Sequence, residues 1–280
     1  MRNILFGVSI IMALFGLAGF ILYVTRTKES HEPYGSSRIL KSGKIQPDIF
    51  IPKHIWLTYN DKSKIPSKVF KALQQFAIYD NKPIPYSIYD DNDCLKFIKR
   101  YFNKSIVNLW FRLKIGAHKA DLFRYCILYI KGGIYLDIKT KLIKPLDQIF
   151  DLNQNILYTV LPLSHPASIY QGVLLSPRGN NIFLDLIRQI SKTKNSKLRD
   201  EYLTITIMTK QIITKYSISG KLSAGPNKLL NNDMSCYLLT EKCTNATTNE
   251  IGDKYGGCCK IYDRDRHVLD TRYNDFGKDW

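Results

Sequence analysis

The sequence has few acidic residues and lacks the signatures of several non-globular protein classes. It contains 24 Asp and Glu against 41 Lys and Arg, so the 280-residue chain has a formal charge of +17. Glycine (16) and proline (11) are ordinary, which excludes collagen-like and low-complexity chains. Six cysteines do not make a disulfide-stapled miniature scaffold. With 45% hydrophobic residues the chain can bury a core, which excludes wholesale disorder.

The excess of positive charge has two interpretations. A basic protein attracts polyanions, nucleotides or anionic lipid surfaces, so nucleic-acid binding is one hypothesis. The other is a lysine-rich surface that is simply well solvated. The basic residues are scattered along the chain, and no zinc or RNA-recognition signature accompanies them. We therefore expect no nucleic-acid partner.

One apolar segment is long enough to cross a membrane. Residues 4–24 read ILFGVSIIMALFGLAGFILYV and carry no charge. About 20 helical residues cross a hydrocarbon layer of about 30 Å, whereas a cleavable signal has an apolar core of about 7–15 residues. The sequence predicts an uncleaved transmembrane signal anchor over residues 1–25, with a cleaved peptide as the alternative. A polar stalk (residues 26–48) and one globular domain (residues 49–280) are expected to follow.

The orientation in the membrane stays open. Arg2 precedes the apolar run and Arg26 and Lys28 follow it, so the basic residues nearly balance. Sequons at Asn103 and Asn245 fit a single-pass type II protein with its body in an ER- or Golgi-like lumen. Four cysteines lie near the C-terminus: Cys236, Cys243, Cys258 and Cys259. In a lumen they could pair, whereas in a cytosol they would be reduced or bind metal.

Segments typical of strands and helices alternate along the globular part. Helical spacing predicts helices over residues 66–78, 94–102, 117–130, 181–190 and 204–213. Apolar runs predict strands over residues 54–57, 86–89, 134–138, 156–161 and 171–176. The charged residues 192–200 are expected to form a loop. This alternation indicates the α/β class.

The most informative stretch joins a helix to a strand through two glycines. Asp121 and Arg124 are three residues apart and share one helix face. Taken alone, they would be a surface ion pair of little energetic value. Gly132 and Gly133 can end the helix in left-handed geometry, and the strand that follows ends at Asp137. Because ligands in open α/β sheets bind beyond the carboxyl ends of strands, these side chains predict a polar pocket for hydroxyls and phosphate.

This stretch resembles the DXD-motif glycosyltransferases of family 32, which include the yeast initiating mannosyltransferases; clostridial glucosylating toxins share the motif. The family pattern is A-x-x-A-D-x-x-R-Y, an apolar helix, and G-G-x-Y-x-D-x-D. The sequence matches it at Ala117, Ala120, Asp121, Arg124, Tyr125, Gly132, Gly133, Tyr135 and Asp137. Weaker similarity runs from Ile51 to Trp280. The resemblance implies a GT-A type, Rossmann-like nucleotide-sugar-binding domain with a mixed central sheet.

The resemblance also implies a reaction. A hexose would move, with retention at the anomeric carbon, from a UDP- or GDP-sugar to a glycan, glycolipid or glycoprotein acceptor. Asp121 and Arg124 would hold the sugar hydroxyls and the diphosphate, since the guanidinium fork pairs well with phosphate. Asp137 would bind ribose or sugar hydroxyls and reach Mn²⁺ or Mg²⁺. The catalytic effect is expected to be electrostatic, through positive groups held where phosphate charge develops.

Four further residues are expected to bind the donor by the same resemblance: Trp56, Tyr125, Gln171 and Trp280. Trp56 would stack on the nucleotide base through its ring face. Trp280 would fold its indole over the diphosphate. Gln171 belongs to the segment that closes the sugar pocket in the family.

One position departs from the family pattern. Lys139 stands where the family has the second acid of the motif, the direct metal ligand, and an ammonium cannot bind a hard cation. Asp275 could supply the missing ligand together with Asp137. Lys139 could instead neutralise the leaving diphosphate itself, without a metal. As a third alternative, catalysis is lost and the chain only binds a nucleotide sugar or carbohydrate.

Overall fold

The computed structural model describes residues 39–41, 43, 45–230, 234–243 and 258–272. The chain divides into two units, residues 1–36 and 37–280, and every described residue belongs to the second. Within that part of the chain no helix is both long and apolar enough to cross a membrane. The expected anchor over residues 1–25 lies outside the described residues, and so does most of the expected stalk.

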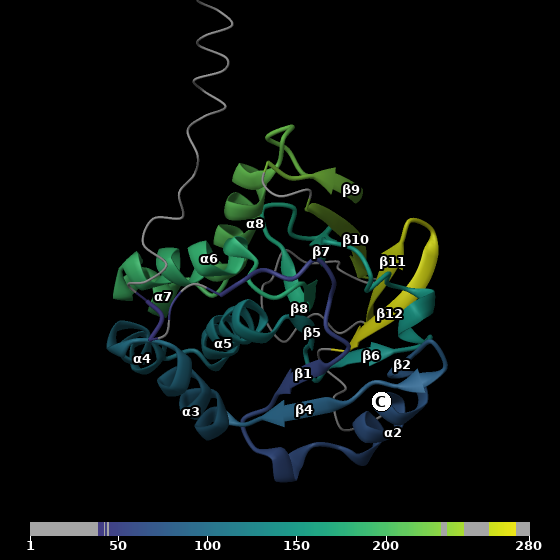
Figure 1. Ribbon diagram of the computed structural model, residues 1–280, viewed down its shortest axis with the longest axis horizontal. Helices are drawn as coiled ribbons and strands as arrows, with labels where there is room; N and C mark the ends of the chain where they lie inside the picture. The colour runs from purple at the N-terminus through teal and green to yellow at the C-terminus, as the bar shows by residue number, and fades with distance from the viewer. Residues whose placement is uncertain (1–38, 42, 44, 231–233, 244–257, 273–280) are drawn as a thin grey trace, which may run out of the picture. The chain divides into compact units, whose positions relative to one another are not determined.

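A ten-stranded mixed sheet forms the centre of the second unit (Figure 1). Its strand order is β4-β1-β5-β8-β7-β10-β11-β12-β6, with β9 beside β10. β1 pairs in parallel with β4 and β5, and β7 with β10; the other pairs are antiparallel. The strands are β1 (Ile55–Thr58), β4 (Tyr86–Tyr89), β5 (Gly133–Leu136), β6 (Thr140–Leu142), β7 (Ile156–Pro162), β8 (Tyr170–Ser176), β9 (Gly225–Lys228), β10 (Ser235–Cys243), β11 (Cys258–Asp263) and β12 (Arg266–Arg272). The expected mixed α/β sheet is thus confirmed.

Helices complete the architecture. The α-helices are α2 (Ser67–Phe76), α3 (Asp91–Tyr101), α4 (Lys104–Arg112), α5 (Gly116–Lys131), α6 (Asn181–Lys192), α7 (Asn195–Asp200) and α8 (Thr204–Tyr216). Two 3-10 turns, η2 (Lys62–Lys64) and η3 (Leu146–Gln148), and a small hairpin of β2 (Ile78–Tyr79) and β3 (Lys82–Pro83) complete the described elements.

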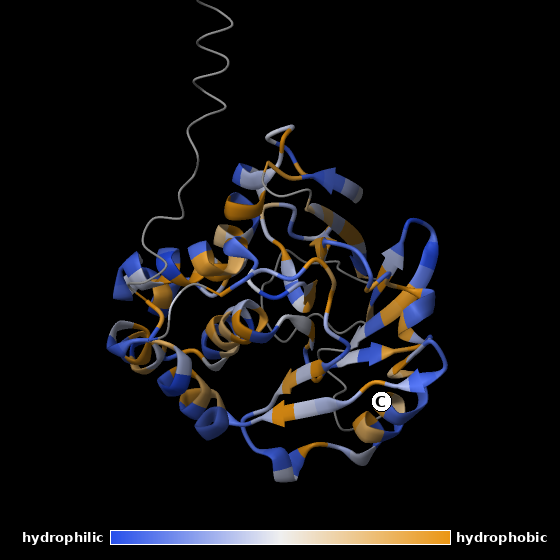
Figure 2. Cartoon of the chain, viewed as in Figure 1, coloured by the Kyte–Doolittle hydropathy of each residue, from blue (hydrophilic) through white to orange (hydrophobic). Residues whose placement is uncertain are grey.

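The sheet separates two hydrophobic cores. One core joins α3 to α8 with Trp56 and Tyr135, and the other joins α2 and η3 with Ile55 and Ile134. Because neighbouring residues of a strand face opposite sides of the sheet, β1 and β5 contribute to both cores. Figure 2 shows the apolar stripes of the helices turned toward the sheet.

Helix α5 is the most deeply buried helix of this layer. Every residue from Asp121 to Ile130 is buried, as is His118. A helix buried on all sides belongs to the core of the fold, so polar residues within it are held by protein contacts. The motif residues Asp121 and Arg124 are therefore interior residues.

Some elements differ from the sequence-based expectation. Residues 195–200 form α7, where a charged loop was expected, because Leu198 is buried and anchors one face of the turn. Helix α4 was not predicted, although Ile106, Leu109 and Trp110 form its buried face. The C-terminal strands β10 to β12 were not predicted either. Strands β10 to β12 are placed by pairing with other strands, and a local pattern does not contain this information.

Two further contacts join parts of the described chain that are distant in the sequence. Leu40 forms a bridge with Phe102, and the Asn103 amide donates to the Ile39 carbonyl at 2.8 Å, so the last part of the expected stalk contacts the α3–α4 junction. A disulfide between Cys243 and Cys259 joins β10 to β11. Cys236, which was grouped with them as a candidate for pairing, is a buried free thiol.

Candidate functional site

The turn between α5 and β5 positions the candidate site. Gly132 and Gly133 have φ of 64° and 104°, a region that glycine adopts without strain. The Trp56 indole donates from Nε1 to the Gly132 carbonyl at 2.7 Å. A Cβ on Gly133 would lie 2.9 Å from both the His54 carbonyl oxygen and Trp56 Nε1. The tight turn thus returns the chain along α5 and brings Asp137 back to Arg124.

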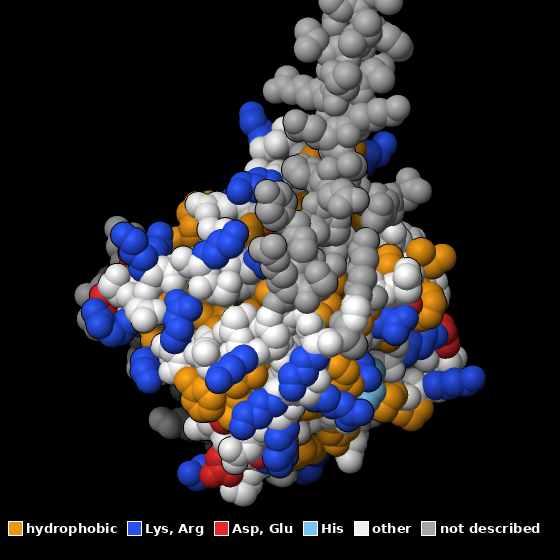
Figure 3. All heavy atoms as spheres, turned by 60° about the vertical axis from the view of Figure 1, so that its left-hand side comes forward, with side chains coloured by type: hydrophobic (Ala, Val, Ile, Leu, Met, Phe, Trp, Pro, Cys, Tyr) orange, Lys and Arg blue, Asp and Glu red, His pale blue; other side chains and the backbone are white. Residues whose placement is uncertain are grey.

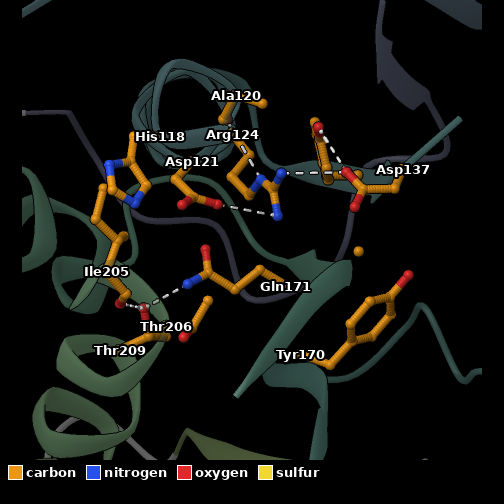
Figure 4. A network of polar contacts seen from close by, with 12 residues as sticks. His118, Ala120, Asp121, Arg124, Asp137, Tyr170, Gln171, Ile205, Thr206 and Thr209 are labelled. Carbon is orange, nitrogen blue, oxygen red and sulfur yellow. Dashed lines mark hydrogen bonds and ion pairs between the residues drawn. The ribbon is translucent and has the colours of Figure 1, made fainter. Parts of the chain in front are cut away.

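Arg124 joins the two acids of the motif (Figure 4). Its Nη1 lies 3.3 Å from Asp121 Oδ1, and its Nη2 donates to Asp137 Oδ1 at 3.1 Å. Nε donates to the Ala120 carbonyl at 3.3 Å, and the guanidinium lies over the Tyr135 ring at 4.6 Å. The structure therefore brings together the three charged residues that the sequence singled out. In this state the guanidinium is already occupied by protein groups.

Asp137 is the accessible member of this cluster. It follows β5 directly, and its side chain is 32% exposed, against 5% for Arg124 and 7% for Asp121. Oδ1 also accepts from the Tyr135 hydroxyl at 3.1 Å, whose oxygen is 2.8 Å from Thr58 Oγ1. Within the described part of the chain, Oδ2 has no hydrogen-bond partner. One carboxylate oxygen at the carboxyl end of the strand can thus receive a ligand.

A second polar layer supports Asp121 from behind. Gln171 on β8 is satisfied when its amide nitrogen faces Asp121 Oδ1 at 3.0 Å and its oxygen accepts from Thr209 Oγ1 at 3.1 Å. The Tyr125 hydroxyl contacts Gln171 and lies 2.7 Å from Thr209 Oγ1. Gln171 is 3% exposed and Tyr125 is fully buried. In this structure both side chains are interior groups that orient the acid.

His118 ties α5 to the segment between α7 and α8. Its Nδ1 lies 3.0 Å from the Leu198 carbonyl oxygen and its Nε2 lies 2.8 Å from that of Tyr202. Carbonyl oxygens only accept hydrogen bonds, so each ring nitrogen bonds its carbonyl when it carries a proton. The imidazole lies one turn before Asp121 in α5.

Burial controls the titration of the cluster. Desolvation raises the pKa of Asp121 to about 6, although the charges of Arg124 and His118 oppose the shift. Burial also works against the charge of Arg124, but Asp137, Tyr135 and Asp121 outweigh it, and the pKa of the guanidinium is raised. Arg124 therefore stays positive, while Asp121 can take up a proton in mildly acidic solution.

The other predicted site residues are less directly placed. Trp56 is 8% exposed, and the His54 ring stacks on it with centroids 3.9 Å apart. The His54 ring covers one face of the Trp56 indole, so a nucleotide base would have to stack on the other face. Base stacking by Trp56 stays a prediction. Lys139 lies half-buried two residues after Asp137. Asp275 and Trp280 lie outside the described residues.

The described residues around Asp137 include too few ligating side chains to enclose a metal ion on their own. Asp137 supplies a single carboxylate oxygen, and Lys139 cannot be a ligand. Mn²⁺ or Mg²⁺ at a nucleotide is nevertheless often held by one or two carboxylates and the phosphates, so Asp137 meets the minimum requirement. The only described cluster with suitable spacing is Glu241, Cys243 and Cys259, and its two sulfurs are joined in a disulfide.

The geometry agrees with a comparison of the sequence with known families. Residues 60–155 match the family described as "Glycosyltransferase sugar-binding region containing DXD motif". This region of the chain is similar to the DXD-motif glycosyltransferases. The matched region contains Asp121, Arg124 and Asp137, so the expected resemblance is confirmed on the residues that carried it. Thr58 and Thr209, which complete the polar network, lie outside it and carry no motif of their own.

Relatives named as glycosyltransferases support the same enzyme class. The initiation-specific alpha-1,6-mannosyltransferase of Saccharomyces cerevisiae is 33% identical over 122 residues, 41% of this chain and 25% of the relative. Its Candida albicans counterpart is 30% identical over 38% of this chain and 29% of the relative. An uncharacterised glycosyltransferase of Acanthamoeba polyphaga mimivirus is 28% identical over 64% of this chain and 75% of the relative. The match thus spans between a quarter and a third of the two yeast proteins.

A solved structure is also similar. The PaToxG glycosyltransferase is 15% identical to this chain, with a TM-score of 0.43 over 62% of this chain and 71% of that structure.

Proposed function

We propose that the protein is a membrane-anchored glycosyltransferase with a GT-A type fold that transfers a hexose from a nucleotide sugar to a glycan or glycoconjugate, with retention. The observation that carries the proposal is Arg124, which holds Asp121 and Asp137 together at the carboxyl end of β5. Carboxylates suit sugar hydroxyls because they accept hydrogen bonds from them. The names of the two yeast relatives make GDP-mannose the first donor to test.

The reaction needs few protein groups. In a front-face transfer the bond between the anomeric carbon and the diphosphate oxygen breaks, and the acceptor oxygen forms its bond on the same face. The acceptor proton passes to the leaving phosphate, so no enzymic base is required. Asp137 holds the donor, Arg124 fixes Asp137, and the ammonium of Lys139 lies two residues away to balance phosphate charge. A retaining glycosidase would instead need two opposed carboxylates about 5 Å apart.

A divalent cation fits this proposal. Asp137 would hold Mn²⁺ or Mg²⁺ together with the donor phosphates, and Asp275 would be the second protein ligand. When bound, the ion would add positive charge beside the diphosphate. In the metal-independent alternative Lys139 alone supplies this charge.

We place the body on the lumenal side of a secretory membrane, as a single-pass type II protein. The disulfide between Cys243 and Cys259 supports this placement, since such bonds persist in oxidising compartments. The apolar run over residues 4–24 would supply the anchor.

The experiment is a donor assay on the full chain in detergent. GDP-mannose and UDP-hexoses are incubated with Mn²⁺ or EDTA, and the released nucleoside diphosphate is measured. We expect turnover that falls at least 100-fold in Asp137→Asn and stays unchanged in Asp265→Asn, an exposed turn acid used as a control. Equal turnover in wild type and Asp137→Asn would contradict the proposal.

Lys139 favours a second candidate, a nucleotide-sugar or carbohydrate binder without catalysis. Calorimetry separates the two, because the second candidate predicts donor binding with no turnover of any donor. The substitution Lys139→Asp restores the family motif. If Lys139 is the only cause of the lost catalysis, Lys139→Asp should give turnover where the wild type has none.

A further inference from the structure

A hollow of about 480 Å³ lies between α4 and α7. It is lined by Asn108, Phe111, Arg112, Lys114, Asn195 and Arg199. None of these residues belongs to the motif or to the polar network around Asp121. Its volume lies within the range of about 300–1,000 Å³ that is usual for small-ligand sites.

The hollow lies in a strongly basic part of the molecule. Residues 94–120, which include α4, contain seven Lys and Arg and no Asp or Glu. Figure 3 shows Lys and Arg side chains spread over the side of the molecule where Figure 1 places α4 and α7, with few acidic ones. Three of the six lining residues are cationic and none is acidic. One of the three, Arg199, pairs with Asp200 at 2.7 Å. The local field therefore favours an anion.

Arg112 fixes the two walls of the hollow to each other. From α4 its Nε donates to Asn195 Oδ1 at 2.7 Å on α7. Its Nη1 and Nη2 donate to the carbonyls of Ser191 and Thr193 at 3.1 Å and 2.8 Å. These bonds use three of the five N–H groups of the guanidinium. The walls are thus held in place by the protein's own contacts.

Phe111 gives the hollow an apolar surface. It is 54% exposed, whereas the other large apolar residues of α4 at Ile106, Leu109 and Trp110 are buried. An isolated exposed ring is ordinary on protein surfaces. Here the ring shares one hollow with two amides and three cations. Its face can pack on the C–H face of a pyranose, the amides can bind hydroxyls, and the cations can pair with an acidic substituent.

We propose that this hollow is a second carbohydrate site, which binds an acidic oligosaccharide with carboxylate or sulfate groups. The proposal does not depend on the donor site. A single-stranded nucleic acid is a poorer fit, because its recognition uses successive aromatic residues along a groove and Phe111 is the only aromatic residue among the six lining residues.

Calorimetric titration of the full chain in detergent tests the proposal. The probes are a heparin-derived tetrasaccharide, which carries uronate and sulfate groups, neutral chitotetraose of the same length, and inorganic sulfate. The variants are Phe111→Ala and Lys114→Glu. Their matched controls are Phe50→Ala, where the ring is 52% exposed, and Lys71→Glu on the exposed face of α2. Asp137→Asn tests independence from the donor site.

We expect the acidic tetrasaccharide to bind at least tenfold more tightly than chitotetraose. Phe111→Ala and Lys114→Glu should each weaken it about tenfold, and neither control nor Asp137→Asn should change it. Equal affinity for the neutral probe would overturn the acidic specificity. The proposal would also be overturned if Phe111→Ala bound the acidic tetrasaccharide as tightly as wild type. It would likewise be overturned if inorganic sulfate, at equal total charge, displaced the tetrasaccharide completely. Either result would show that binding is general charge attraction.

Discussion

Arg124 is the residue on which the candidate site depends most. Its guanidinium compensates Asp121, a carboxylate buried with only 7% of its side chain exposed, and at the same time orients Asp137. Removal of one partner from a buried ion pair leaves an uncompensated charge in the interior, which costs about 3–5 kcal/mol. Arg124 therefore contributes both to the stability of the fold and to the geometry of the site.

The substitution Arg124→Met tests this double role. We expect a loss of about 3–5 kcal/mol in the free energy of unfolding, measured by urea denaturation. The double variant Arg124→Met/Asp121→Asn should recover part of it, because no buried charge then remains. Arg188→Met is the matched control: its partner Asp185 is 39% exposed, so the loss should be smaller. Equal losses in the two single variants would contradict the account.

Asp121 predicts a pH dependence of stability. Its pKa in the folded protein is about 6, above the ordinary value of 3.8, so between these values the folded state binds more protons than the unfolded state. The free energy of unfolding should therefore fall as the pH rises from about 4 to about 6. In Asp121→Asn this contribution is absent, and the difference between the two proteins should change by a few kcal/mol over that interval. Parallel curves for the two proteins would show that Asp121 titrates normally.

At the scale of elements, the turn from α5 to β5 is the most constrained connection. Gly132 has a φ of 64°, and a Cβ there would lie 2.6 Å from the Arg178 amide nitrogen. Gly116, at the start of the same helix, has no atom within 4 Å of such a Cβ. The two glycines form a matched pair at the ends of α5, with Gly116 as its first residue and Gly132 as its C-cap.

Gly132→Ala should thus destabilise the protein by several kcal/mol, because backbone strain and a backbone clash add together. Gly116→Ala should change stability by less than about 1 kcal/mol. Thermal unfolding of both variants checks the comparison. If Gly132→Ala and Gly116→Ala unfold at the same temperature, the turn does not have the constrained geometry described.

The same unit shows what the sequence can predict. The helix of α5, its glycine turn and β5 were all predicted, because each depends on a local pattern of apolar residues and glycines. Helix α7 was not, since it is six residues long and depends on one buried leucine, Leu198. The hairpin of β11 and β12 turns at Arg264 with a φ of 56°, where a turn-forming glycine or asparagine would be usual. Without that signal the hairpin could not be predicted.

At the scale of the whole molecule, long-range contacts complete the site. The sequence predicted Asp121, Arg124 and Asp137 as a cluster because they lie within 17 consecutive residues. It assigned Tyr125 and Gln171 to the substrate, whereas the fold encloses both behind Asp121 with Thr209 of α8. This support layer joins α5, β8 and α8, and no local pattern relates segments so far apart. The fold also brings three basic residues, Arg112, Lys114 and Arg199, to the lining of one hollow.

The central claim is that Asp137, which Arg124 joins to the buried Asp121, holds the sugar of a nucleotide sugar. The most direct measurement is calorimetric binding of GDP-mannose and GDP, and of UDP-glucose and UDP, to the full chain with Mn²⁺. In at least one of these two pairs, the wild type should bind the nucleotide sugar at least tenfold more tightly than the corresponding nucleoside diphosphate. This difference in affinity should vanish in Asp121→Asn and in Asp137→Asn. A difference that survives in both variants, or is absent in wild type for both pairs, would contradict the account.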